Sequence, residues 1–129
     1  MAACLFFALM LAIGAIPGEA AMLSAKIDDK LLHFCAYGLL SALVFNGLTV
    51  SAPARALRTL LLIAALGALD EIIQSFIPYR RAGILDWLVD ILAACCSVAF
   101  LLAVRALHDR RKAARTANSP ASAQVEGNG

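Results

Sequence analysis

The sequence predicts an all-α fold, namely a polytopic membrane protein built as a bundle of about four transmembrane helices. The 129-residue chain is 62% hydrophobic and only 16% charged, whereas a soluble domain is roughly half apolar and a quarter charged. Its apolar residues gather in runs close to the roughly 17–25 residues that a helix needs to cross a bilayer. Short polar segments separate these runs, and the length suits a single domain.

The apolar runs define the expected transmembrane helices. We place the spans at about residues 1–17, 31–50, 58–77 and 84–104. The first run has an alternative interpretation as a signal peptide, because Gly18, Glu19 and Ala20 form a small-x-small site. It lacks the basic n-region of such a peptide, which favours a span.

The segments between the spans predict how the helices are connected. "SAPAR", residues 51–55, is short and contains Pro53, which favours a turn. "PYRRAG", residues 78–83, is equally short, so the third and fourth spans should form an antiparallel hairpin. We expect a transmembrane domain over residues 1–115. The tail, residues 116–129, has the polar, small-residue composition of a disordered end.

The distribution of Lys and Arg predicts the orientation of the spans. With four spans, one side of the membrane holds seven of these residues, namely Arg55, Arg58, Arg105, Arg110, Arg111, Lys112 and Arg115. The other side holds four, namely Lys26, Lys30, Arg80 and Arg81. We therefore expect a multi-pass protein of the inner (cytoplasmic) membrane with both termini in the cytoplasm.

Polar residues interrupt the apolar runs near the outer ends of three spans, and these residues form the candidate site. Within each span they recur at i, i+4 spacing, which places them on one face of a helix. Folding the hairpin at residues 80 and 81 puts Glu71 level with Asp90, and Gln74 level with Trp87 and Asp86. The candidate site residues are Asp29, Lys30, His33, Tyr37, Asp70, Glu71, Gln74, Arg80, Asp86 and Asp90.

The cost of these residues is the reason to expect partners for them. An ionisable side chain at the middle of a bilayer costs about 2.5–3.5 kcal/mol on insertion scales. The carboxylates should therefore face the bundle interior or a water-filled cleft, where Lys30, His33, Arg80 and Arg81 are the available cations. A structural network of Asp–Arg pairs would account for any single residue. The gathering of the whole set on three helices favours a functional site.

Two blocks of sequence resemble the VanZ-like family. "DKLLHFCAYGLL", residues 29–40, is similar to the family's D-K-x-x-H-F-x-x-Y block. "DEIIQSFIPYRRAGILDWLVDILAA", residues 70–94, is similar to its D-E-x-x-Q-x-F-x-P-x-R block, which runs into D-x-x-x-N/D. The chain departs from the family at Tyr79, where Gly is frequent, and at Ala93 and Ala94 on a helix that favours Gly. The polar positions are all retained.

The resemblance implies a polytopic bacterial membrane protein that acts at the cell envelope, since the member that names the family is associated with low-level teicoplanin resistance. We expect it to bind or modify a lipid-linked or glycopeptide-type target through an outward-facing polar site. One alternative is a membrane enzyme acting on lipid head groups, with a carboxylate or His33 as general base. The other is a small proton-coupled transporter.

The expected partners follow from the same interpretation. They are the lipid bilayer and a lipid head group, a lipid-linked precursor or a glycopeptide, with no nucleic acid. The chain has no nucleophile motif such as GxSxG and no Walker loop, so the sequence leaves catalysis open. No cofactor is evident, but the acidic residues have the oxygen ligands that a divalent metal ion prefers.

Overall fold

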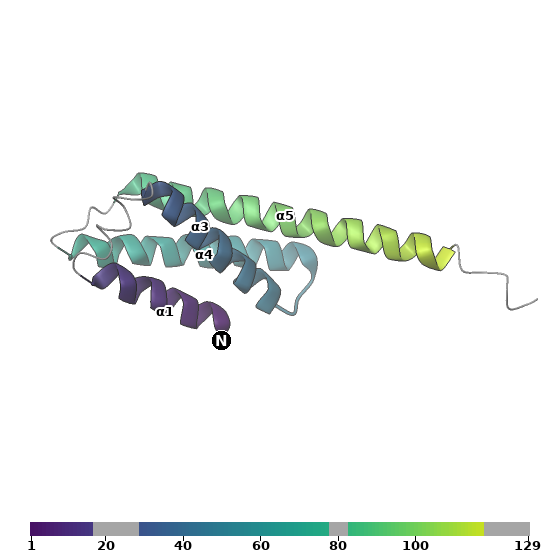
Figure 1. Ribbon diagram of the computed structural model, residues 1–129, viewed down its shortest axis with the longest axis horizontal. Coiled ribbons are helices and arrows are strands. Elements are labelled where there is room, and N and C mark those ends of the chain that lie inside the picture. Colours follow the sequence, from purple (N-terminus) through teal and green to yellow (C-terminus); the bar gives the residue numbers. More distant parts are fainter. Residues whose placement is uncertain (17–28, 78–82, 118–129) are drawn as a thin grey trace, which may run out of the picture. The chain divides into compact units, whose positions relative to one another are not determined.

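The computed structural model describes residues 1–16, 29–77 and 83–117, and this part of the chain consists of α-helices (Figure 1). The predicted all-α class is therefore confirmed. The helices, in chain order, are α1 (Ala2–Ala15), α3 (Asp29–Gly47), α4 (Ala52–Ser75) and α5 (Ile84–Ala117). The predicted outer turn around Arg80 and Arg81 lies outside the described residues. Of the tail predicted to be disordered, residues 116–129, the first two belong to α5 and the rest lie outside the described residues.

The start of α4 differs from the prediction. The turn expected at residues 51–55 instead lies just before it, and Pro53 falls in the first helical turn. A proline is tolerated there because its missing N–H has no intrahelical acceptor in any case. Ser51 is the N-cap residue, and its carbonyl accepts the backbone N–H of Arg55 at 2.8 Å. The guanidinium of Arg55 also donates to the Val50 carbonyl at 3.0 Å, which fastens the turn to the helix.

Helix α5 is longer than the span predicted for it, because it continues past Val104 to Ala117. The extension, "RALHDRRKAAR", is rich in Ala, Arg and Lys, which have high helix propensity. The chain divides into two compact units, residues 1–99 and residues 100–129. In the second unit, the described basic side chains from Arg110 to Arg115 are exposed.

The hydrophobic core of the first unit is small and draws on all four helices. Its buried members are Phe7, Tyr37, Leu40, Ile63, Ala93 and Ala94. The small side chains of Ala93 and Ala94 let the backbone of α5 pack close to the rest of the core. Gly67 of α4 likewise allows close approach, because a Cβ at that position would lie 3.0 Å from Oδ2 of Asp90.

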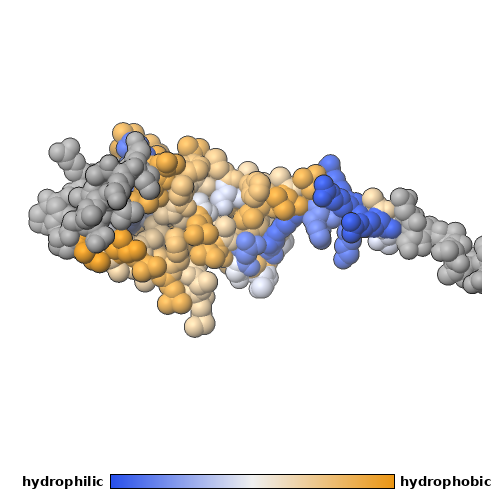
Figure 2. All heavy atoms as spheres, viewed as in Figure 1, coloured by the Kyte–Doolittle hydropathy of each residue, from blue (hydrophilic) through white to orange (hydrophobic). Residues whose placement is uncertain are grey.

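The first unit has an apolar exterior and a partly polar interior. Leu5, Leu39, Leu61, Ile72 and Leu92 are each at least half exposed. His33, Asp70, Gln74, Asp86 and Asp90 are buried instead. Figure 2 shows hydrophobic residues over most of the visible described surface of this unit and hydrophilic ones along the C-terminal part of α5. Soluble proteins rarely expose continuous apolar surface of this extent.

One described helix is long and apolar enough to cross a membrane by length and composition, and it covers Ile84–Thr116. Helix α1 is apolar but has only 14 residues. Helix α3 has 19 residues, and Lys30, His33 and Asn46 lower its overall apolar character. Length and composition thus support one crossing, and the four crossings expected from the sequence remain a prediction.

Candidate functional site

The structure brings eight of the predicted site residues together between three helices, and we call them the polar cluster. Helix α3 supplies the first three, α4 the next three and α5 the last two. In α3 and α5 successive members are three or four residues apart, and in α4 Gln74 lies three and four residues after Glu71 and Asp70, so each set lies on one side of its helix. Asp29 begins α3 and Arg80 lies outside the described residues, so neither side chain can be placed. The members of the polar cluster are Lys30, His33, Tyr37, Asp70, Glu71, Gln74, Asp86 and Asp90.

The central contact of the polar cluster joins α3 to α5. Nδ1 of His33 and Oδ1 of Asp90 are hydrogen-bonded at 3.0 Å, and their side chains are 7% and 0% exposed. The other carboxylate oxygen of Asp90 is buried and has no hydrogen-bond partner among the described residues. It faces Gly67 of α4, whose lack of a side chain leaves room for it.

A second buried contact joins α3 to α4. The hydroxyl of Tyr37 donates to Oδ2 of Asp70 at 3.1 Å. The rings of His33 and Tyr37, one helical turn apart, are stacked with centroids 6.0 Å apart and planes at 9°. Tyr37 therefore supports the orientation of the His33 imidazole and also supplies a donor to Asp70.

Two further contacts lie at the start of α5. Nζ of Lys30 forms an ion pair with Oδ1 of Asp86 at 3.0 Å, with the Lys30 side chain 52% exposed. Oε2 of Glu71 accepts the backbone N–H of Gly83 at 2.6 Å. The predicted role of Lys30 and His33 as partners of the carboxylates is thus met, and the same role for Arg80 and Arg81 lies outside the described residues.

The register of the α4–α5 hairpin agrees with the prediction at one level and differs at another. Glu71 and Asp90 do meet, since ligand atoms of both and of His33 lie within 4.8 Å of one another. The prediction that Gln74 is level with Trp87 is wrong, because the indole N–H of Trp87 donates to the Ala64 carbonyl at 2.9 Å. The backbone N–H of Gly83, just before α5, is bound to Glu71, which lies four residues before the last residue of α4. Helix α5 therefore begins beside Glu71 and not beside the end of α4.

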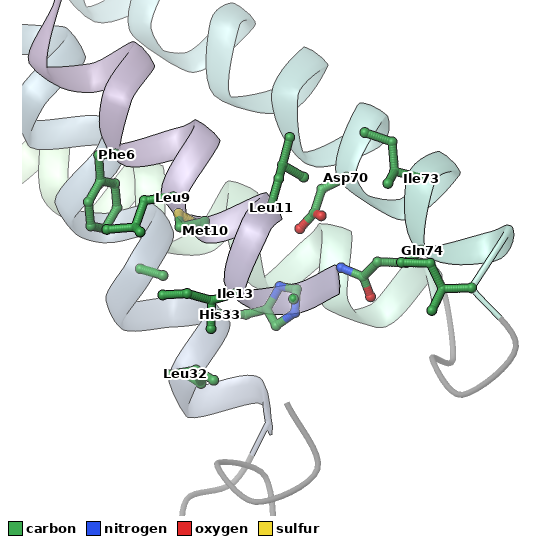
Figure 3. A pocket seen from close by; sticks show the side chains of 13 residues that line it. Phe6, Leu9, Met10, Leu11, Ile13, Leu32, His33, Asp70, Ile73 and Gln74 are labelled. Carbon is green, nitrogen blue, oxygen red and sulfur yellow. The ribbon is translucent and has the colours of Figure 1, made fainter. Parts of the chain in front are cut away.

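A cavity of about 230 Å³ adjoins the polar cluster between α1, α3 and α4. One side is apolar and includes Phe6, Met10 and Ile13 of α1. Figure 3 shows the polar ends of His33, Asp70 and Gln74 directed from α3 and α4 toward the space that α1 covers. The sequence interpretation missed the contribution of α1, because an unbroken apolar run has no signal that distinguishes a cavity wall from a lipid-facing surface.

No protein-family model matches the chain, and no solved structure matches it. The chain is similar to an uncharacterized protein of Schizosaccharomyces pombe, with 33% identity over 106 residues. The match covers 81% of this chain but only 64% of that protein, so the chain spans less than two thirds of the relative's length.

Proposed function

We propose that this chain is a multi-pass membrane protein of the VanZ-like kind that binds a lipid or lipid-linked target of the cell envelope at its polar cluster. The cavity is the observation that supports this function best. Its apolar wall and its polar end, formed by His33, Asp70 and Gln74, match the two parts of an amphiphilic ligand. A ligand of this class enters such a cavity with its chain against α1 and its head group against the polar residues.

The distribution of side chains supports a membrane location. In water, exposed leucines and isoleucines over a whole helical unit would drive aggregation, whereas in lipid they are solvated. Helices α3 and α4 have 19 and 24 residues. At 1.5 Å per residue they extend roughly 28 and 36 Å, close to the ~30 Å hydrocarbon core. The apolar exterior is the support for several crossings, and the lengths of α3 and α4 are compatible with them although their composition is less apolar than that of α5. The inner-membrane location and cytoplasmic termini are proposed from the Lys and Arg distribution.

The size and charge of the site narrow the ligand class. A drug-sized ligand needs a pocket of roughly 300–1,000 Å³, so a cavity of about 230 Å³ takes only part of an acyl chain or a small head group. A lipid-tailed glycopeptide would therefore bind through its tail alone. Of the four carboxylates in the described polar cluster, Asp70 lines the cavity, beside His33 and Gln74. A head group with hydroxyl or ammonium donors therefore suits the cavity better than a bare phosphate.

Photo-crosslinking tests this function. The full chain in lipid nanodiscs would be exposed to phosphatidylethanolamine or phosphatidic acid with a diazirine in the acyl chain. Ala36 lines the cavity, and Ala65 is exposed on α4 outside it. Ala36→Leu should reduce crosslinking to phosphatidylethanolamine several-fold, whereas Ala65→Leu should not.

Three outcomes of this experiment would contradict the proposal. Equal labelling of both variants would mean that the lipid reaches only the outer surface. Stronger labelling by phosphatidic acid would refute the inferred preference for head groups with donors. A change in the mass of the bound lipid would identify an enzyme rather than a binding protein.

A further inference from the structure

Three members of the polar cluster form a smaller group whose chemistry the lipid site does not explain. His33 of α3, Glu71 of α4 and Asp90 of α5 each offer one ligand atom, and these atoms lie within 4.8 Å of one another. Each residue comes from a different helix, so the group exists only when α3, α4 and α5 are assembled. In addition to this proximity, each of the two carboxylates has a buried oxygen without a hydrogen-bond partner among the described residues.

Both carboxylates are only half satisfied. Asp90 uses Oδ1 for His33, and Glu71 uses Oε2 for the backbone N–H of Gly83. Oδ2 of Asp90 and Oε1 of Glu71 are buried and have no partner among the described residues. Oδ2 of Asp90, on a side chain that is 0% exposed, is directed at the α4 face that holds Gly67 and, one turn later, Glu71. Leaving such an atom without a partner costs about 1–3 kcal/mol or more for a charged group.

We propose that His33, Glu71 and Asp90 bind one divalent first-row metal ion, Zn²⁺ or Mn²⁺. One imidazole nitrogen with two carboxylate oxygens is a donor set that suits these ions. Two ligands about 2.1 Å from a tetrahedral ion lie roughly 3.4 Å apart. The observed 3.0 Å between Nδ1 of His33 and Oδ1 of Asp90 is close to that spacing. Glu71 of α4 offers the third ligand atom, within 4.8 Å of those of His33 and Asp90.

The surrounding contacts are those that hold metal ligands in place. The ring of Tyr37 stacks on His33, and the Gly83 N–H holds one oxygen of Glu71. Outer contacts of this kind fix ligand orientation in metal sites. His33 also lines the cavity, which places the ion at the polar end of the cavity. The position of the ion relative to a bound lipid rests on the proposed lipid site, whereas binding of the ion itself does not.

Metal analysis of the purified full chain in detergent tests the inference. The protein would be treated with EDTA, dialysed against Zn²⁺, Mn²⁺ or Mg²⁺ and its metal content measured. We expect about one Zn²⁺ or Mn²⁺ per chain and no stoichiometric Mg²⁺. Co²⁺ substitution should give an absorption spectrum typical of mixed nitrogen and oxygen ligands.

Matched variants identify the ligands. Glu71→Gln and Asp90→Asn should each weaken binding at least about tenfold. Asp86→Asn is the control, because Asp86 lies one turn before Asp90 on α5 but is paired with Lys30. Absence of stoichiometric Zn²⁺ or Mn²⁺ from the wild-type chain overturns the inference whether or not any variant folds. An equal loss in Asp86→Asn also overturns it, since the effect would then be one of general charge.

The metal and lipid experiments fail independently. Ion binding that persists while Ala36→Leu has no effect on crosslinking supports the metal site and contradicts the lipid site. If crosslinking depends on the cavity but no ion is bound, the lipid site is supported and the metal site is contradicted.

Discussion

The contact between α4 and α5 at Gly67 gives the sharpest stability prediction. Gly67→Ala adds one methyl group that would lie 3.0 Å from Oδ2 of Asp90 and 3.1 Å from Cδ1 of Trp87. Favourable contacts between such atoms begin at about 3.5–4.0 Å. Neither neighbour can move away easily, because Asp90 is bonded to His33 and the Trp87 indole to the Ala64 carbonyl.

The expected effect is the difference between two contributions. Overpacking of this kind costs about 1–3 kcal/mol, and the helix propensity of Ala over Gly returns about 0.5–1 kcal/mol. We therefore expect Gly67→Ala to lower the free energy of unfolding by up to about 2.5 kcal/mol, with a central value of about 1.3 kcal/mol, which is about a tenfold change in the folding equilibrium.

Denaturant unfolding in detergent, followed by Trp87 fluorescence and far-UV circular dichroism, measures this change. Gly38→Ala is the matched control, since Gly38 lies within α3 and an added Cβ there meets nothing within 4 Å. That variant should be unchanged or more stable by up to about 1 kcal/mol. Gly67→Ala at or above wild-type stability would refute the close approach of α4 and α5 at this point.

Two other substitutions test separate contacts, and a labelling experiment tests the exterior of the helices. Tyr37→Phe keeps the ring but removes the donor to Asp70, so the free energy of unfolding should fall by about 1–3 kcal/mol, and a value near zero would contradict that hydrogen bond. Lys30→Met should cost less than about 1 kcal/mol in the same assay, because the Lys30 side chain is 52% exposed and solvent weakens its pair with Asp86; a larger loss would contradict that screening. The four cysteines are free and exposed on the helices. In intact membranes a membrane-impermeant maleimide should label them only after detergent is added, and rapid labelling beforehand would argue against a lipid-facing exterior.

The sequence predicted the positions of the helices from its apolar runs and the polar cluster from the spacing of polar residues within those runs, because both are local features. Lys30, His33 and Tyr37 recur at helical spacing in α3, and Asp86 and Asp90 do so in α5, so each set had to share a face. Their mutual approach followed from the cost of exposing charge to an apolar environment, which does not depend on knowing the exact packing.

Features that depend on packing between helices could not be predicted in the same way. The position of Trp87 beside Ala64 depends on how α4 and α5 pack against each other, and residue spacing does not specify that geometry. The wall of the cavity on α1 is equally hidden, because Phe6 and Leu5 look alike in the sequence although one lines the cavity and the other is exposed. The third helix was predicted to begin at about residue 58, whereas α4 begins at Ala52. The difference arose because Pro53 was interpreted only as a residue that favours a turn.

The pairing of α3 with α5 has a consequence for how the chain is made. Lys30 and His33 are separated from their partners Asp86 and Asp90 by 56 and 57 residues. During synthesis, α3 leaves the ribosome long before α5 does. If the chain crosses a bilayer, α3 waits with the basic groups at its start unmatched, at a cost below that of about 2.5–3.5 kcal/mol for a charge at the bilayer centre. A nascent chain that stops before Ile84 cannot remove that cost. The late arrival of two aspartates would then distinguish a finished protein from an interrupted one.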